Sequence, residues 1–143
     1  MQVDETAPTG IATVELSGNG LAHFTIQENV AWDYLAATGK ALAVASTADA
    51  ICFGSLAQRS EPSRYAIQQL VAATSAGALR VFDINLRQGF YSRGTIEESL
   101  QLANVLKLND DELPTVGEMF SLTGSIECQI ERVAQMFSLR LLH

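Results

Sequence analysis

The sequence predicts an α/β fold: a mostly parallel sheet with helices on both faces, and a β-hairpin that projects from it. Three observations predict this class. Strand and helix patterns alternate from about residue 33, single helices separate the strands, and a hairpin pattern precedes them. Strands joined through single helices run parallel, because each connection is a crossover, and such crossovers are right-handed.

The hairpin pattern covers residues 11–28. Apolar and polar residues alternate in 11–16 and again in 22–26, and Ser-Gly-Asn-Gly lies between them at 17–20. Glycine and asparagine adopt the positive φ of tight turns at little cost. We therefore expect residues 1–30 to form a projecting hairpin segment and residues 31–143 to form a partial α/β core.

The first half of the core is predicted from periodicity and capping residues. Helical periodicity covers residues 33–47, and residues 50–54 have the composition of a buried strand. Pro62 suits the first turn of a helix that runs to about residue 74, with Ser60 as its cap. Residues 79–84 form the next strand.

The second half continues the alternation. Thr95 and Glu98 have the spacing of a capping box for a helix that ends near residue 104. Residues 105–108 form a strand, Asn109 opens another helix, and Ser125 caps a last amphipathic helix. Residues 139–142 begin a further apolar strand. Such a strand needs partners, so we expect a piece of a longer fold.

Composition narrows the function classes. The 143 residues fit one domain, and a formal charge of −7 argues against a nucleic-acid binder, which would carry a basic stripe. Cys52 and Cys128 belong to no ligand cluster of the kind that zinc needs. No apolar run approaches the ~20 residues of a membrane helix, and residues 1–5 lack the basic region and apolar core of a signal peptide. We expect a soluble, cytoplasmic protein.

Polar side chains follow the predicted strands where these end. Asp83, Asn85 and Arg87 come after one strand, and Asn109 and Glu112 come after the next. In open α/β sheets, ligands bind outside the carboxyl ends of the strands. In an extended segment the first three side chains share a face, and a guanidinium beside amides suits a phosphate or sugar hydroxyls. We therefore expect one shared site for an anion or a hydrated metal.

Structural explanations compete with this site. Asn109 and Glu112 have the spacing of a capping-box variant, which needs no ligand and is worth ~1 kcal/mol. The functional alternative is a helix N-terminus that orders water around Mg²⁺. Asp83 and Arg87 could form an ion pair or a turn cap. A hydrolase that uses Ser55 is weakly supported, because the second glycine of a nucleophile elbow is missing.

The strand-end motifs resemble those of a known family. Asp-Ile-Asn-Leu-Arg at 83–87, followed by Leu-Lys-Leu-Asn-Asp-Asp-Glu at 106–112, looks like the middle of a ribokinase-like carbohydrate kinase of the phosphofructokinase-B type. Residues 50–60 resemble the fructokinase branch, and residues 8–10 resemble the start of the lid strands of that family. The resemblance covers roughly residues 8–142.

This resemblance implies a Rossmann-like core with a β lid at residues 1–30, and ATP-dependent phosphorylation of a sugar hydroxyl. By match to the family motifs, Asp83, Asn85 and Arg87 would line the cleft near the sugar and the transferred phosphoryl group. Asn109 and Glu112 would help to place Mg²⁺ and the ATP phosphates, with Glu112 acting on the metal through water. A homodimer could form through the hairpin, since exposed edge strands can pair with another copy.

Two family segments have no match in this sequence. One is the glycine-rich sugar-binding segment, and the other is the G-A-G-D anion hole, whose Asp is the catalytic base. We therefore expect little or no kinase activity from the polypeptide alone. The alternative is a non-catalytic module that binds a sugar or a nucleotide, or a subunit that a partner chain completes.

Overall fold

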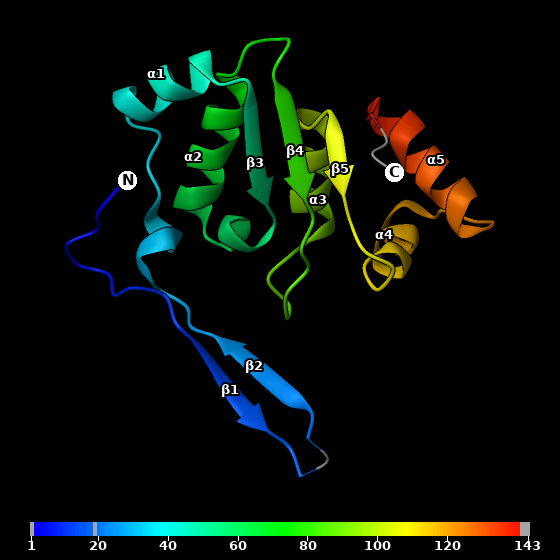
Figure 1. Cartoon of the computed structure of the whole chain (residues 1–143), viewed down its shortest axis with the longest axis horizontal. Helices are drawn as coiled ribbons and strands as arrows, with labels where there is room; N and C mark the ends of the chain where they lie inside the picture. The colour runs from blue at the N-terminus through cyan, green and yellow to red at the C-terminus, as the bar shows by residue number, and fades with distance from the viewer. Residues whose placement is uncertain (1, 19, 141–143) are drawn as a thin grey trace.

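The computed structural model describes residues 2–18 and 20–140. This part of the chain forms two sheets. An antiparallel hairpin pairs β1 (Ala12–Leu16) with β2 (Ala22–Ile26), and a parallel sheet has the order β3 (Ala50–Gly54), β4 (Leu79–Asp83), β5 (Val105–Lys107). In Figure 1 the hairpin extends from the core on the side toward which the three parallel strands point. The α/β class with a hairpin is confirmed.

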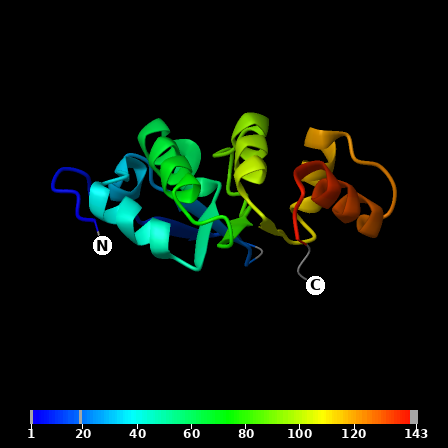
Figure 2. The same ribbon diagram turned by 90° about the horizontal axis from the view of Figure 1, so that it is seen from above.

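Helices connect and flank the parallel strands. Two 3₁₀ helices and five α-helices occur in the described part: η1 (Ala31–Tyr34), α1 (Gly39–Thr47), η2 (Leu56–Arg59), α2 (Glu61–Ala72), α3 (Arg93–Leu102), α4 (Leu113–Phe120) and α5 (Ile126–Phe137). Figure 2 shows α2 and α3 on the same side of the sheet. Right-handed crossovers that advance in one direction, from β3 to β4 to β5, place successive helices on one face.

The hydrophobic core lies between this face of the sheet and the two crossover helices. Phe53 of β3 and Phe82 of β4 are register partners, and their rings stack with centroids 5.2 Å apart. Side chains from α2 and α3 cover them, including Val71 and Leu100, which are fully buried. The burial of these large apolar groups is the main source of stability for the sheet.

The opposite face of the sheet is in part uncovered among the described residues. Cys52 and Leu79, which alternate with the core residues along β3 and β4, remain exposed in the described part of the chain. Neither crossover helix can reach them, because both crossovers have the same hand and direction. The described helices α2 and α3 thus supply one of the two expected layers.

The expected helix at residues 33–47 begins later than its periodicity indicates. Residues 31–34 form η1, and α1 begins only at Gly39, where the Thr38 hydroxyl accepts a hydrogen bond from the Ala41 N–H at 3.2 Å. The Asp33 carboxylate, which the helix prediction placed inside the helix, instead accepts from the Val30 N–H at 3.1 Å. This bond caps the N-terminus of η1, and the helix ends at Leu35, where the backbone becomes extended with ψ 145°.

Two predicted caps are also corrected. Ser92, not Thr95, caps α3, and its hydroxyl accepts from the Thr95 N–H at 3.1 Å. Ser60 precedes α2, but its hydroxyl donates to the Asp33 carbonyl instead of capping the helix. The cap at Ser125 before α5 is confirmed.

The predicted strand at 139–142 is described only at its start. Arg140 forms a parallel bridge with Val105, and residues 141–143 lie outside the described residues. No described helix is long and apolar enough to cross a membrane.

Candidate active site at the strand ends

The carboxyl ends of β4 and β5 lie side by side. Asp83, the last residue of β4, is the register partner of Lys107, the last residue of β5. Lys107 Nζ lies 2.8 Å from Asp83 Oδ1, and this hydrogen bond raises the pKa of Lys107. Both side chains are in part exposed, so the pair contributes little to stability. Asp83 therefore pairs with Lys107, and not with Arg87 as the ion-pair alternative supposed.

The backbone turns directly after β4. Asn85 has a φ of 41° and Gln88 a φ of 48°, both in the left-handed region. The prediction that Asp83, Asn85 and Arg87 share one face of an extended segment is therefore wrong, because the extended segment ends at Asp83. Arg87 is exposed, and its Nη1 donates to the Leu86 carbonyl at 2.9 Å. Arg87 thus lies in an exposed loop at the strand ends.

Asn109 and Glu112 form the reciprocal cap that their spacing indicates. The Glu112 N–H donates to Asn109 Oδ1 and the Asn109 N–H donates to Glu112 Oε2, each at 3.0 Å. The second carboxylate oxygen, Oε1, accepts from the Leu86 N–H at 2.9 Å. Glu112 is buried, so its carboxylate joins the loop after β5 to the loop after β4. It has a structural role whether or not it also serves a ligand.

Ser55 supports the loop after β4 through a hydrogen bond to its backbone. Its hydroxyl is fully buried and donates to the Ile84 carbonyl at 2.6 Å. The adjacent Gly54 leaves no room for a side chain, because a Cβ there would lie 2.9 Å from the Asp83 carbonyl oxygen. A buried, engaged hydroxyl does not fit the nucleophile of a hydrolase.

Replacing Ser55 with alanine should reduce the free energy of unfolding by about 1–3 kcal/mol, because the buried Ile84 carbonyl loses its donor. Urea denaturation checks this. The exposed Ser46 on α1 offers a control, and its alanine variant should stay within about 0.5 kcal/mol of the parent. An esterase activity that disappears with Ser55 would contradict the structural role.

The hairpin contacts the strand-end loop. Gln88 Oε1 accepts from the Ile26 N–H at 3.2 Å, which ties the last residue of β2 to the loop after β4. Arg59 at the end of η2 donates from Nη2 to the Gln27 carbonyl at 2.6 Å. These two contacts hold the base of the hairpin over the strand ends.

Arg59, the last residue of η2, is the centre of a buried cluster. Its Nε and Nη2 donate to the two carboxylate oxygens of Asp33, each at 2.8 Å, and both side chains are about 95% buried. The guanidinium lies 4.1 Å from the Trp32 ring centroid and 4.5 Å from that of Phe90. Burial raises the pKa of Asp33, but the bonds from Arg59 and the Val30 amide outweigh it and leave the pKa lowered.

The sequence did not predict the contacts of Asp33, Arg59 and Gln88, because the partners of these residues are distant in sequence. One signal for Arg59 was available in the sequence: this arginine follows the buried strand at 50–54 after only four intervening residues. Trp-Asp directly after the hairpin was the corresponding signal for Asp33.

The donor set fits a hydrated cation better than a directly bound one. Among the described residues, no three His, Cys, Asp or Glu side chains gather as a metal cluster. Glu112 already accepts two backbone N–H groups, which leaves part of its acceptor capacity for water. Mg²⁺ keeps several waters and takes few protein ligands, so a contact through water suits this carboxylate.

The chain matches a family model described as pfkB family carbohydrate kinase over residues 1–137. A search of curated proteins found no match.

Solved structures of sugar kinases share the fold. A fructokinase with bound ATP from Xylella fastidiosa is 20% identical with a TM-score of 0.77, over 96% of this chain and 43% of its own. An uncharacterized sugar kinase from Pyrococcus horikoshii is 25% identical with a TM-score of 0.71, over 85% of this chain and 42% of its own. A structure of that same kinase in complex with ATP matches with a TM-score of 0.70. The chain thus spans less than half the length of these kinases.

Proposed function

Because the chain belongs to the pfkB family of carbohydrate kinases, we propose that it serves the ATP-dependent transfer of a phosphoryl group to a sugar hydroxyl, with a fructokinase-like substrate. The observation that supports this most is the arrangement of two polar strand ends, joined by Glu112, beneath the base of the hairpin. Phosphoryl transfer depends mainly on positioning and on stabilisation of charge, which such an arrangement can supply.

Each strand end has its own proposed task. Asp83, Asn85 and Arg87 lie near the sugar and the transferred phosphoryl group, with the exposed Arg87 guanidinium compensating negative charge. Asn109 and Glu112 place the ATP phosphates and Mg²⁺, with Glu112 acting through water. When bound, Mg²⁺ would compensate the charge of the phosphates. The reciprocal cap between the exposed Asn109 and the buried Glu112 keeps both loops rigid for this purpose.

We further propose that the 143-residue polypeptide alone turns over slowly or not at all. Its sequence has no G-A-G-D segment to supply a catalytic base. A general base contributes typically ~10²–10⁴-fold to the rate, and an oxyanion-type site contributes further.

A coupled assay of ADP release, with fructose and related sugars, tests both parts of the proposal. We expect little turnover from the polypeptide alone, and turnover from a chain extended by segments that carry the glycine-rich sugar site and G-A-G-D. In the extended chain, Arg87→Gln should lower kcat, and Arg132→Gln on α5 should not. Robust turnover by the 143 residues alone would disprove the need for the missing base.

A non-catalytic binding module is the alternative. It predicts that calorimetry detects the binding of a sugar or of Mg-ATP without ADP release in any extended chain. Turnover by the extended chain would exclude it.

The hairpin is the proposed contact of a homodimer. Its apolar side chains Val14, Leu16 and Phe24 are 53–75% exposed, which is unusual for a hairpin that stays solvated. Sedimentation should show a dimer that Phe24→Asp converts to a monomer, while Tyr65→Asp on the exposed side of α2 leaves it intact. A monomeric parent chain at all concentrations would refute the dimer.

A further inference from the structure

A polar cavity lies beside the loop after β4, toward the crossover helices α2 and α3. Its volume is about 240 Å³, and it is lined by η2 residues, by Arg64 of α2, by residues 89–92 and by Thr95 of α3. None of the proposed kinase residues lines it. The short connection from Arg87 to Gly89 joins the two regions along the chain.

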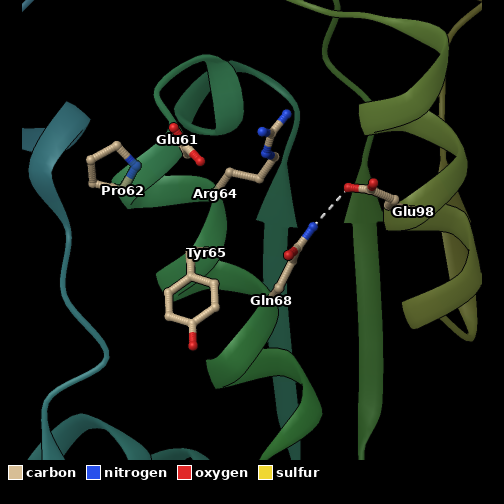
Figure 3. Close-up of a pocket in the computed structure, with 6 residues that line it drawn as sticks. All are labelled: Glu61, Pro62, Arg64, Tyr65, Gln68 and Glu98. Atoms are coloured by element: carbon tan, nitrogen blue, oxygen red, sulfur yellow. Dashed lines mark hydrogen bonds between the residues drawn. The ribbon is translucent and has the colours of Figure 1, made fainter.

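The ionic residues that line this cavity are all basic. Its two ionic lining residues in the described structure are Arg59 and Arg64, and no acidic residue lines it. The guanidinium of Arg64 has no hydrogen bond or ion pair among the described residues. Figure 3 shows Arg64 in the neighbouring pocket that Glu61 and Glu98 also line, with its guanidinium turned away from Tyr65 and from the Gln68–Glu98 contact.

Arg59 supplies a second, independent observation. Its side chain is 94% buried, and Nε and Nη2 are bound by Asp33 and Gln27, but the buried Nη1 has no partner in the described structure. A buried donor without an acceptor costs about 1–3 kcal/mol, and more when it is charged. Native proteins retain such a group where a ligand, an ion or ordered water completes it.

The opposite wall adds one further hydroxyl donor, because one of its two hydroxyls donates to the other. The hydroxyls of Ser92 and Thr95 lie 2.9 Å apart at the N-terminus of the ten-residue helix α3. The N-terminal end of a helix carries positive partial charge and favours an anion. At 240 Å³ the cavity is smaller than the ~300–1,000 Å³ of sites for drug-sized ligands, so it suits one small charged group.

We propose that this cavity is an anion site that binds a phosphate group, with Arg64 as its principal ligand. Guanidinium groups bind phosphate oxygens through paired hydrogen bonds, and one arginine here is free to do so while the other is fixed. The phosphate belongs to inorganic phosphate or to a small phosphorylated metabolite. The proposal does not depend on the kinase function, because none of the residues proposed for that function takes part.

Calorimetric titration of the 143-residue protein with inorganic phosphate at constant ionic strength tests the site. We expect Arg64→Gln to weaken binding at least about tenfold, since a charge-assisted hydrogen bond is worth ~1.5–3 kcal/mol and ~1.4 kcal/mol is a factor of ten. Gly89→Asp should also abolish binding. A Cβ at Gly89 meets no atom within 4 Å, so this variant should fold while it adds a carboxylate to the lining.

A control variant locates the effect. Arg132→Gln removes the same charge from α5 and should not change binding. The proposal is overturned if the parent protein binds no phosphate, if Arg64→Gln binds as the parent does, or if Arg132→Gln loses binding to the same extent.

The source of the phosphate is distinguished by a second titration with glycerol 3-phosphate, and with glycerol as the control. Tighter binding of the ester than of inorganic phosphate assigns the site to a phosphorylated metabolite. Equal or weaker binding of the ester assigns it to free phosphate. In either case Arg64→Gln should weaken both titrations by at least about tenfold.

Discussion

Replacing Asp33 with alanine is expected to reduce the free energy of unfolding by about 3–5 kcal/mol, because it leaves the Arg59 guanidinium buried without its carboxylate partner. The pair is about 95% buried on both sides, and Arg59 also lies between two aromatic rings. It cannot move into solvent without giving up these contacts and its bond to the hairpin. Urea denaturation followed by circular dichroism measures the loss.

The protein contains a matched control for this experiment. Asp83 and Lys107 have the same 2.8 Å separation as Asp33 and Arg59, but their side chains are 32% and 63% exposed. Asp83→Ala should therefore cost only about 0–1 kcal/mol. If Asp33→Ala costs no more than Asp83→Ala, the buried cluster is not what holds the hairpin base to the core.

The same pair predicts an acid dependence of stability. The pKa of Asp33 is lowered in the folded protein, so its contribution is present above the unfolded pKa and is lost as the pH falls through the folded pKa, below about 4. The Asp33→Asn variant has no carboxylate at this position, so it lacks this contribution to stability at every pH. The difference in stability between the parent and this variant should shrink as the pH falls from 7 to 3.

Replacing Glu112 with alanine has the second largest expected effect, a loss of about 2–4 kcal/mol. Its carboxylate accepts the N–H groups of Leu86 and Asn109, and hydrogen bonds to a charged group are worth ~1.5–3 kcal/mol each. Glu112→Gln should cost less, because the amide retains one acceptor oxygen. Glu118 is exposed on α4, and its glutamine variant should stay within about 0.5 kcal/mol of the parent.

Hydrogen exchange gives a local readout of the same contact. In the parent protein the Leu86 and Asn109 amides should be protected, and in Glu112→Ala both should exchange faster while core amides such as that of Val71 keep their order of protection. Equal protection of Leu86 in the parent and the variant would show that Glu112 does not join the two loops.

The sequence predicted the alternating core because its helices and strands have strong periodicity and clear ends. The strands at 50–54 and 105–108 and the cap at Ser125 follow from local patterns. The start of α1 did not follow, because a long-range pairing of Asp33 with Arg59 competes with helix formation there. Likewise, the Thr95 and Glu98 spacing imitated a cap that Ser92 supplies one turn earlier.

Local spacing predicted one contact among the proposed site residues, but not how the two strand-end loops are joined. The spacing of Asn109 and Glu112 indicates the reciprocal bonds between them. The third bond, from Leu86, joins residues 26 positions apart and depends on the register of β4 and β5, which no local pattern contains. The left-handed turn at Asn85 was missed for a related reason: asparagine tolerates positive φ, but only the tertiary structure imposes it.

The most direct test of the account is a titration of the isotope-labelled protein with Mg-ATP, followed by NMR. If the two strand ends form the phosphate side of a kinase cleft, the largest saturable shifts should occur in the amides of Asp83 to Arg87 and of Lys107 to Glu112, and Arg87→Gln should weaken them. Shifts confined to other surfaces, or strand-end shifts that Arg87→Gln leaves unchanged, would contradict the assignment of this cleft.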